Sequence, residues 1–113
     1  MPRQPPKPAR PLSLSAVVVL DAIARRVSHG FDIMDATGLP SGTVYPILGR
    51  LERDGYVRSR WEAQTTAFRE KRPPRRYYEV TAIGTKALVH SIEHYRTLGG
   101  RQALSAARAP LPE

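Results

Sequence analysis

Hydroxyl-bearing and very small side chains are concentrated in one short stretch, residues 41–49, which two arginines follow. Serine and threonine hydroxyls can bond base edges or phosphates, and small residues let a backbone approach a ligand closely. Arginines further along can reach the phosphate backbone. The stretch therefore predicts a nucleic-acid contact made by Ser41, Gly42, Thr43, Tyr45, Pro46, Gly49, Arg50 and Arg53.

Tyr45 allows two interpretations. Its hydroxyl and apolar ring suit a contact with a thymine methyl group, but its helical phase also permits a partly buried packing role. No Asn, Gln or Arg occupies the first turn of this stretch, where side chains make bidentate contacts with bases. We therefore expect sequence-dependent DNA shape to carry more of the specificity than direct base contacts.

A second basic group lies in a polar segment further along the chain. Its members are Arg69, Lys71, Arg72 and Arg75, with Arg76 directly after them. A flexible basic loop can lie along phosphates or in a minor groove, and the alternative is a solvated charged loop without a partner. We assign the first four of these residues to DNA binding.

Positive charge is unevenly distributed over the 113 residues, whose net charge is +8. Residues 50–76 hold nine Lys and Arg against four acidic residues, and residues 1–11 hold three basic residues and no acidic one. Concentrated positive charge on a small protein indicates a polyanionic partner, and we expect double-stranded DNA.

No pattern in the chain predicts catalysis. The absence of cysteine excludes thiol nucleophiles, disulfides and thiolate metal sites. His90 and His94 have the i, i+4 spacing of a metal-binding pair, but no third ligand accompanies them, and surface positions are the simpler interpretation. The chain also lacks a phosphate-binding glycine loop and a nucleophile elbow. We predict no enzyme activity, no metal and no cofactor.

Apolar residues at helical spacing predict a first helix that starts at Ser13 or Ser15 and ends near Val27. Val18 and Val19 widen its apolar surface beyond one stripe. A helix that is apolar on more than one side is buried on more than one side. The second face contacts either another subunit or the centre of the protein's own core.

Two shorter helices follow. The first, over residues 31–36, offers three side chains to the core: Phe31, Ile33 and Met34. Ser41 is then predicted to cap a third helix that runs to about Asp54, with Gly55 as its left-handed end. Pro46 lies inside this helix, where it removes one backbone donor and is expected to bend the first turn.

After Gly55 the apolar period changes from about 3.6 to 2, which predicts strands over residues 56–61 and 75–80 with a polar loop between them. Thr81 can cap a last helix, which Gly99 and Gly100 end. Its apolar stripe consists of Ile83, Ala87, Leu88, Ile92, Tyr95 and Leu98. This order is that of a winged helix-turn-helix with an added C-terminal helix, a mostly α fold with a small β-hairpin (α+β).

Proline usage and charge divide the chain into four parts. Residues 1–11 contain five of the 11 prolines and are predicted to be a disordered basic tail. Residues 12–80 form the winged helix-turn-helix domain, 81–98 a dimerisation helix and 99–113 a flexible tail. No apolar run approaches the ~20 residues of a membrane span and no signal-peptide core is present, so we expect a cytoplasmic protein without a membrane partner.

The run from Leu39 to Val57 resembles the PadR family of transcriptional regulators. It contains Ser-Gly-Thr-x-Tyr-Pro-x-Leu, then Arg-Leu-Glu and a glycine before the first strand. Further matches are Trp61, the run Arg76–Thr81 with Gly84, and the run Gly30–Ile33. The resemblance extends over about residues 12–98.

This resemblance implies a homodimer held by its C-terminal helices, often against the partner's first helix. It also implies repression by occupying a promoter, with release by a small-molecule effector in some members. The single C-terminal helix is similar to that of the family's small subfamily. The expected dimer contacts are Val18, Val19, Ile83, Leu88, Ile92, Tyr95 and Leu98.

Two-fold symmetry would match a pseudo-palindromic operator with half-sites about one DNA turn, ~34–36 Å, apart. Two other functions fit the same element order. One is a winged-helix module that binds a protein, and the other is a nonspecific nucleic-acid-binding protein. Steep weakening of binding with salt separates the DNA-binding functions from the protein-binding one.

Overall fold

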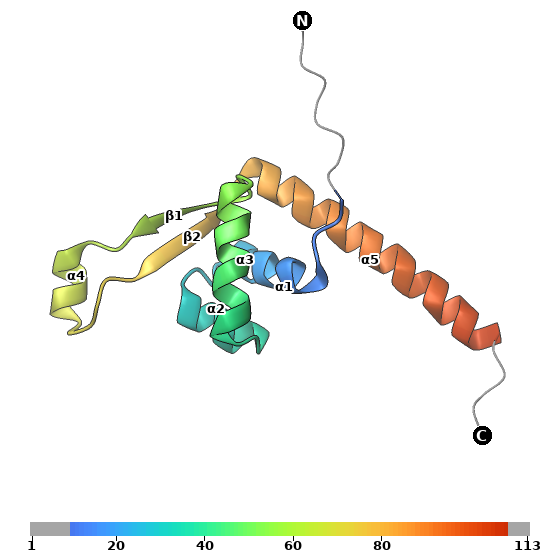
Figure 1. Ribbon diagram of the computed structural model, residues 1–113, viewed down its shortest axis with the longest axis horizontal. Coiled ribbons are helices and arrows are strands. Elements are labelled where there is room, and N and C mark those ends of the chain that lie inside the picture. The colour runs from blue at the N-terminus through green and yellow to red at the C-terminus, as the bar shows by residue number, and fades with distance from the viewer. Residues whose placement is uncertain (1–9, 109–113) are drawn as a thin grey trace, which may run out of the picture.

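A computed structural model describes the backbone of residues 10–108 and the side chains of residues 10–99. In chain order the elements are α1 (Leu14–Ala24), α2 (Gly30–Thr37), α3 (Ser41–Arg53), β1 (Val57–Trp61), α4 (Gln64–Arg69), β2 (Arg76–Val80) and α5 (Ala82–Arg108). The β-hairpin projects from one side of a helical body, and α5 extends from the other side (Figure 1). The predicted winged-helix α+β class is confirmed. The predicted N-terminal tail falls largely on residues 1–9, outside the described residues. Of the predicted C-terminal tail, 109–113 also lie outside them, whereas 99–108 are helical, so a flexible tail from residue 99 is wrong.

Helix α1 is the centre of the core and contacts α2, α3, α5 and β2. Ser13 is its N-cap, since the Ala16 amide donates to the Ser13 hydroxyl at 3.2 Å. The helix ends at Ala24, before the predicted end, because Arg26 enters the left-handed region with φ +72°. Val19 is 0% exposed, so it belongs to the protein's own core and its prediction as a dimer contact is wrong.

Helix α2 buries Ile33, as predicted, but Phe31 is 69% exposed and its prediction as a core residue is wrong. Successive residues of a helix are rotated by about 100°, so a side chain two positions before Ile33 faces about 200° away from it. The helix can therefore bury only one of these two side chains in the core. Ile33 occupies the core, and Phe31 faces solvent.

Helix α3 begins at Ser41, with Pro40 in the N-cap position, so the prediction of Ser41 as the cap is wrong. The amides of Thr43 and Val44 donate to the Pro40 carbonyl at 2.9 and 3.0 Å. Pro46 lies inside the helix, which continues unbroken to Arg53. The left-handed glycine that follows it is confirmed, with φ +79° at Gly55.

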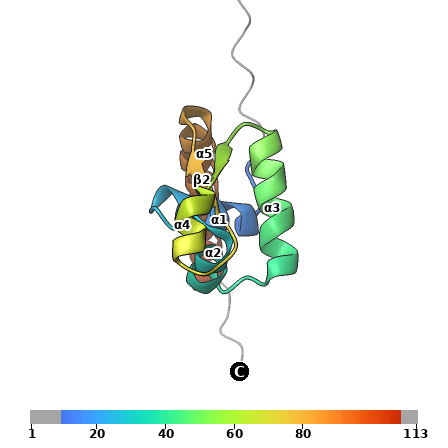
Figure 2. The same ribbon diagram turned by 90° about the vertical axis from the view of Figure 1, so that its left-hand side faces the viewer.

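The two strands pair antiparallel, with Val57 opposite Val80 and Trp61 opposite Arg76. The Tyr78 amide donates to the Ser28 carbonyl at 2.7 Å, which attaches the hairpin to the connection between α1 and α2. The predicted loop between the strands is not an irregular loop, because it contains α4. Figure 2 looks along the hairpin and places α4 at its outer end, with α3 alongside.

Helix α5 starts at a threonine cap, as predicted: the Gly84 amide donates to the Thr81 hydroxyl at 3.1 Å. A Cβ at position 84 would lie 1.9 Å from the Tyr56 carbonyl oxygen, so only glycine fits under the turn before β1. The predicted helix end at Gly99 and Gly100 is wrong, since α5 runs to Arg108. Alanine-rich sequence after the glycines has high helix propensity and offsets their cost. Within residues 10–108, no helix combines the length and hydropathy of a membrane span.

Candidate nucleic-acid interface

One face of α3 is an exposed stripe of small residues that ends in an arginine. The helix buries its other face through Val44, Ile47, Leu48 and Leu51. The exposed side, which we call the α3 stripe, consists of Gly42, Pro46, Gly49 and Arg53. Their spacing of three or four residues aligns them along one side of the helix. A Cβ on Gly42 or Gly49 would have no described atom within 4 Å, so the space above both glycines is open.

Tyr45 lies beside the α3 stripe and combines the two roles that its sequence position allowed. Its side chain is 47% exposed, yet its ring rests on the first residue of α2. A Cβ at Gly30 would lie 2.4 Å from the Tyr45 hydroxyl oxygen and 2.9 Å from the ring carbon that bears it. Gly30 therefore makes room for the ring, and the packing leaves one half of Tyr45 accessible.

The remaining predicted contacts of α3 flank the stripe. Ser41 and Arg50 are exposed, and Thr43 is half-buried. Among the described residues, no side chain caps the start of the helix. The first turn of α3 therefore presents the exposed Ser41 hydroxyl and the half-buried Thr43 hydroxyl.

A charged cluster connects α3 to the hairpin. The Arg76 guanidinium lies 3.0 Å from a Glu52 carboxylate oxygen, and its Nε donates to the Ser59 hydroxyl at 2.9 Å. The Ser59 hydroxyl in turn donates to Glu52. The guanidinium also lies 5.5 Å from the Trp61 ring centre and 5.9 Å from that of Tyr78. We call Glu52, Ser59 and Arg76 the hinge cluster, because it fixes the hairpin relative to α3.

A second charged cluster holds the outer end of the hairpin, residues 62–75, which we call the wing tip. The Glu62 carboxylate accepts from the Arg72 guanidinium at 3.0 Å and from the Tyr77 hydroxyl at 3.0 Å. Its side chain is only 8% exposed. The hydrogen bond from Arg72 lowers the pKa of Glu62 to about 2, against the opposing effect of burial. Glu62 is therefore ionised at neutral pH.

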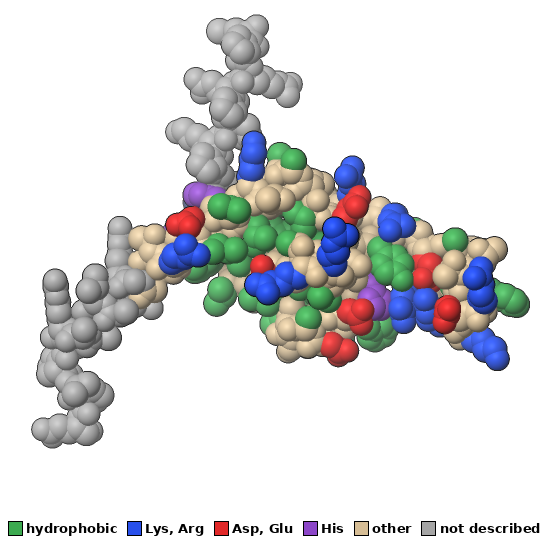
Figure 3. Space-filling model, turned by 180° about the vertical axis from the view of Figure 1, so that it is seen from behind, with side chains coloured by type: hydrophobic (Ala, Val, Ile, Leu, Met, Phe, Trp, Pro, Cys, Tyr) green, Lys and Arg blue, Asp and Glu red, His purple; other side chains and the backbone are tan. Residues whose placement is uncertain are grey.

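The predicted basic residues of the wing tip divide into two groups. Arg69 and Lys71 are exposed, and Arg75 is half-buried. Arg72 is directed inward onto Glu62, with a side chain that is 24% exposed. On the face seen in Figure 3, Lys and Arg side chains gather at the hairpin end, interspersed with acidic ones. Sequence reasoning missed Glu52, Ser59 and Glu62. The available signal for the two glutamates was that they are isolated acids within a basic block.

Most of the predicted dimer contacts on α5 face the protein's own core. Leu88 is buried, Ile92 and Tyr95 pack against the core cluster, and the Tyr95 hydroxyl donates to the Leu12 carbonyl at 2.7 Å. The stripe on α5 is first needed to cover α1, so Leu88 is not free for a partner. Ile83 and Val18 remain exposed at 52% and 37%, and Leu98 is half-buried.

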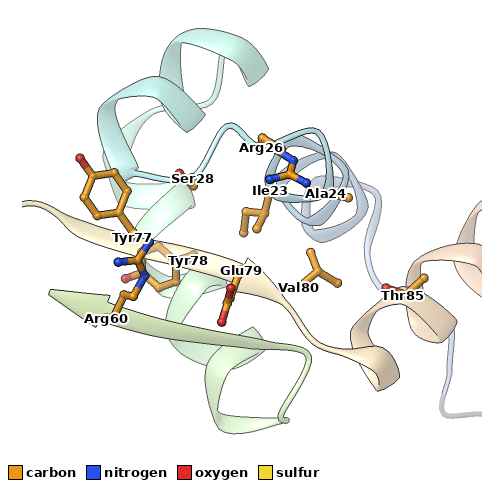
Figure 4. Close-up of a pocket in the computed structure, with 10 residues that line it drawn as sticks. All are labelled: Ile23, Ala24, Arg26, Ser28, Arg60, Tyr77, Tyr78, Glu79, Val80 and Thr85. Atoms are coloured by element: carbon orange, nitrogen blue, oxygen red, sulfur yellow. The ribbon is translucent and has the colours of Figure 1, made fainter. Parts of the chain in front are cut away.

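A cavity of about 440 Å³ lies behind the hairpin, between the end of α1, strand β2 and the start of α5 (Figure 4). Its lining is mixed, with apolar, aromatic and charged side chains: Ile23, Ala24, Arg26, Ser28, Arg60, Tyr77, Tyr78, Glu79, Val80 and Thr85. The Glu79 carboxylate is paired with Arg58 at 2.8 Å. This space is formed within one chain and needs no second subunit.

The fold has close counterparts among solved structures. Smu.1704 from Streptococcus mutans UA159 matches with a TM-score of 0.70 at 23% identity, over 92% of this chain and 99% of that one. A PadR family transcriptional regulator from Eggerthella lenta DSM 2243 matches with a TM-score of 0.70 at 20% identity, over 83% and 82%. One from Clostridium difficile R20291 matches with a TM-score of 0.68 at 19% identity, over 80% and 95%. At these identities the likeness shows the fold.

The family itself is established by sequence. No curated protein matches the chain. The profile of the transcriptional regulator PadR-like family, however, matches residues 19–90, from the middle of α1 to the first turns of α5. This match spans more than half of the chain and includes α3, the hinge cluster and the wing tip. The chain therefore belongs to the PadR-like family of transcriptional regulators.

Proposed function

We propose that this protein is a sequence-specific DNA-binding repressor that binds a pseudo-palindromic operator as a homodimer. The α3 stripe carries the proposal. Glycine inside a helix costs about 0.5–1 kcal/mol relative to alanine, and no described atom occupies the space above Gly42 or Gly49. Close approach of another surface, such as the floor of a major groove, would explain why both positions are glycine despite this cost.

In this arrangement α3 enters the major groove with its first turns towards the base edges. The hydroxyls of Thr43 and Tyr45 would contact bases, and Arg50 and Arg53 would bind phosphates. Arg69, Lys71 and Arg75 of the wing would bind phosphates of the neighbouring groove. Arg72 is absent from this set because its guanidinium holds Glu62.

Exposed apolar side chains on α1 and α5 support the homodimer. Val18, Ile83 and Leu98 retain accessible surface after the core has formed. Repression would follow from occupying a promoter in the cytoplasm, and the cavity behind the hairpin offers a place for a small-molecule effector.

The test begins with selection of DNA from a random duplex library by the purified protein. We expect a two-fold consensus with half-sites ~34–36 Å apart. Gly49→Ala should then weaken binding to the selected duplex by tenfold or more while raising stability by about 0.5–1 kcal/mol.

Gly99→Ala is the matched control, because Gly99 is also helical with no described atom near its Cβ position. It should stabilise the protein similarly and leave DNA affinity unchanged. Selection that yields no consensus, or a Gly49→Ala variant that binds as well as the wild type, would contradict the proposal.

A further inference from the structure

The wing tip exposes a phenylalanine almost completely. Phe68, on α4, is 87% exposed, more than any other large hydrophobic side chain among the described residues. The next residue inward, Ala67, is 1% exposed. Ala67 marks the buried side of α4, and the exposed Phe68 is directed away from that side. The helix stands at the outer end of the hairpin, remote from the core (Figure 1).

The tip holds this side chain in a fixed place. Glu62 joins the start of the tip to Arg72 near its end and to Tyr77 on β2. The Arg72 amide also donates to the Ala67 carbonyl at 3.1 Å, which closes the turn after α4. Phe68 therefore lies on a hydrogen-bonded element of defined structure.

The charge of the wing tip and the length of the hairpin indicate which kind of surface Phe68 contacts. Arg69 and Lys71, on either side of Glu70, are exposed and suit a polyanion better than an apolar protein surface. Strand β1 starts four residues after α3 ends, and a strand of five residues spans about 17 Å. That length exceeds the ~12 Å width of a major groove, so the tip reaches beyond the groove that α3 occupies.

We propose that Phe68 is an apolar wedge that enters the minor groove beside the major groove read by α3 and partly unstacks one base step, while Arg69 and Lys71 bind the flanking phosphates. The inference rests on the proposed function and extends it to specificity. Apolar wedges in minor grooves kink DNA, and pyrimidine–purine steps unstack most easily. Phe68 would thus select a flexible step at a fixed offset from each half-site.

The experiment uses the wild-type protein and a 30-base-pair duplex obtained by selection, with dyes at both ends and 2-aminopurine at the step next to each half-site. Wild-type protein should shorten the end-to-end distance and raise 2-aminopurine fluorescence. Phe68→Ala should abolish both signals and weaken binding about tenfold, with an unchanged salt dependence because no charge is altered. Phe68→Leu should retain most of both signals.

Phe31→Ala removes the same side chain from an exposed position on α2 and should leave both signals intact. If Phe68→Ala bends the duplex and binds it as the wild type does, the wedge is wrong and the proposed function stands. An equal loss from Phe31→Ala would also refute the wedge. If the wild type selects no duplex at all, both proposals fail.

Discussion

Helix α3 and the wing tip are both exposed, but different forces hold them in place. Four apolar side chains bury one face of α3, with exposed fractions of 0–5%. The wing tip buries one alanine and relies on the Glu62 carboxylate, bonded to Arg72 and Tyr77. Apolar packing responds weakly to pH and salt, whereas a charged cluster depends on the ionisation of its members. Helix α3 is thus firmly fixed, and the wing tip is the part whose structure depends on pH and salt.

The largest effect should come from the apolar attachment of α3. Leu48, 1% exposed, contacts the core at the middle of the helix. Leu48→Ala should lower the free energy of unfolding by about 2–5 kcal/mol, measured by urea denaturation. Arg53→Ala, on the opposite side of the same helix, should change stability by less than about 0.5 kcal/mol. A loss below about 1 kcal/mol for Leu48→Ala would mean that packing does not hold α3.

Glu62→Gln should have an intermediate and local effect. The pKa of Glu62 is lowered in the folded protein, from 4.5 to about 2. The contribution of ionised Glu62 to the free energy of unfolding is therefore present above about pH 4.5 and is lost as the pH falls towards 2. NMR titration of the Tyr77 amide in the folded protein should show a transition near pH 2 in the wild type and none in Glu62→Gln, which should resemble the acid form at neutral pH.

Glu70→Gln is the control for this titration, because Glu70 is an exposed acid on the same wing tip. It should leave the Tyr77 transition in place. A wild-type Tyr77 transition near pH 4.5, the ordinary value for a glutamate, would show that Arg72 and Tyr77 do not stabilise the ionised Glu62.

The smallest effects should come from the exposed cations. Lys71→Ala should make the negative slope of log affinity against log salt concentration less steep by about 0.9, the value for one phosphate contact. It should weaken binding to all sequences alike. Arg72→Ala should leave that slope nearly unchanged and disturb the Tyr77 amide as Glu62→Gln does. Equal slopes for the two variants would mean that Arg72 leaves Glu62 for a phosphate, which would remove the distinction between the two groups of basic residues.

Periodicity predicted the regular elements because apolar residues recur along each of them at the period of its backbone. The apolar spacing in α1 and α3 and the alternation in β1 and β2 appear in the structure with ends shifted by a few residues. Left-handed Gly55 and the threonine cap at Thr81 were predictable because each depends on local backbone chemistry. Phe31 could not be placed, since hydrophobicity does not indicate which of two competing side chains a short helix will bury.

The charged clusters lay beyond sequence reasoning because their members are distant in the chain. Glu52 and Arg76 are 24 positions apart, and only the hairpin register brings them together. Glu62 and Arg72 meet because α4 forms in a segment whose polar composition suggested a loop. Long-range packing also buries Val19 and Leu88 in the core. Their apolar character alone could not distinguish a subunit contact from a core position.

Leu12 has a consequence for how the protein can be cut into fragments. Its amide donates to the Ser91 hydroxyl at 3.0 Å and its carbonyl accepts from the Tyr95 hydroxyl, contacts that span 79 and 83 positions of the chain. A DNA-binding fragment truncated after β2 would lose both partners and uncover α1, which α5 contacts. The shortest fragment that folds should therefore extend through Tyr95, and the two ends of the domain should unfold as one cooperative unit.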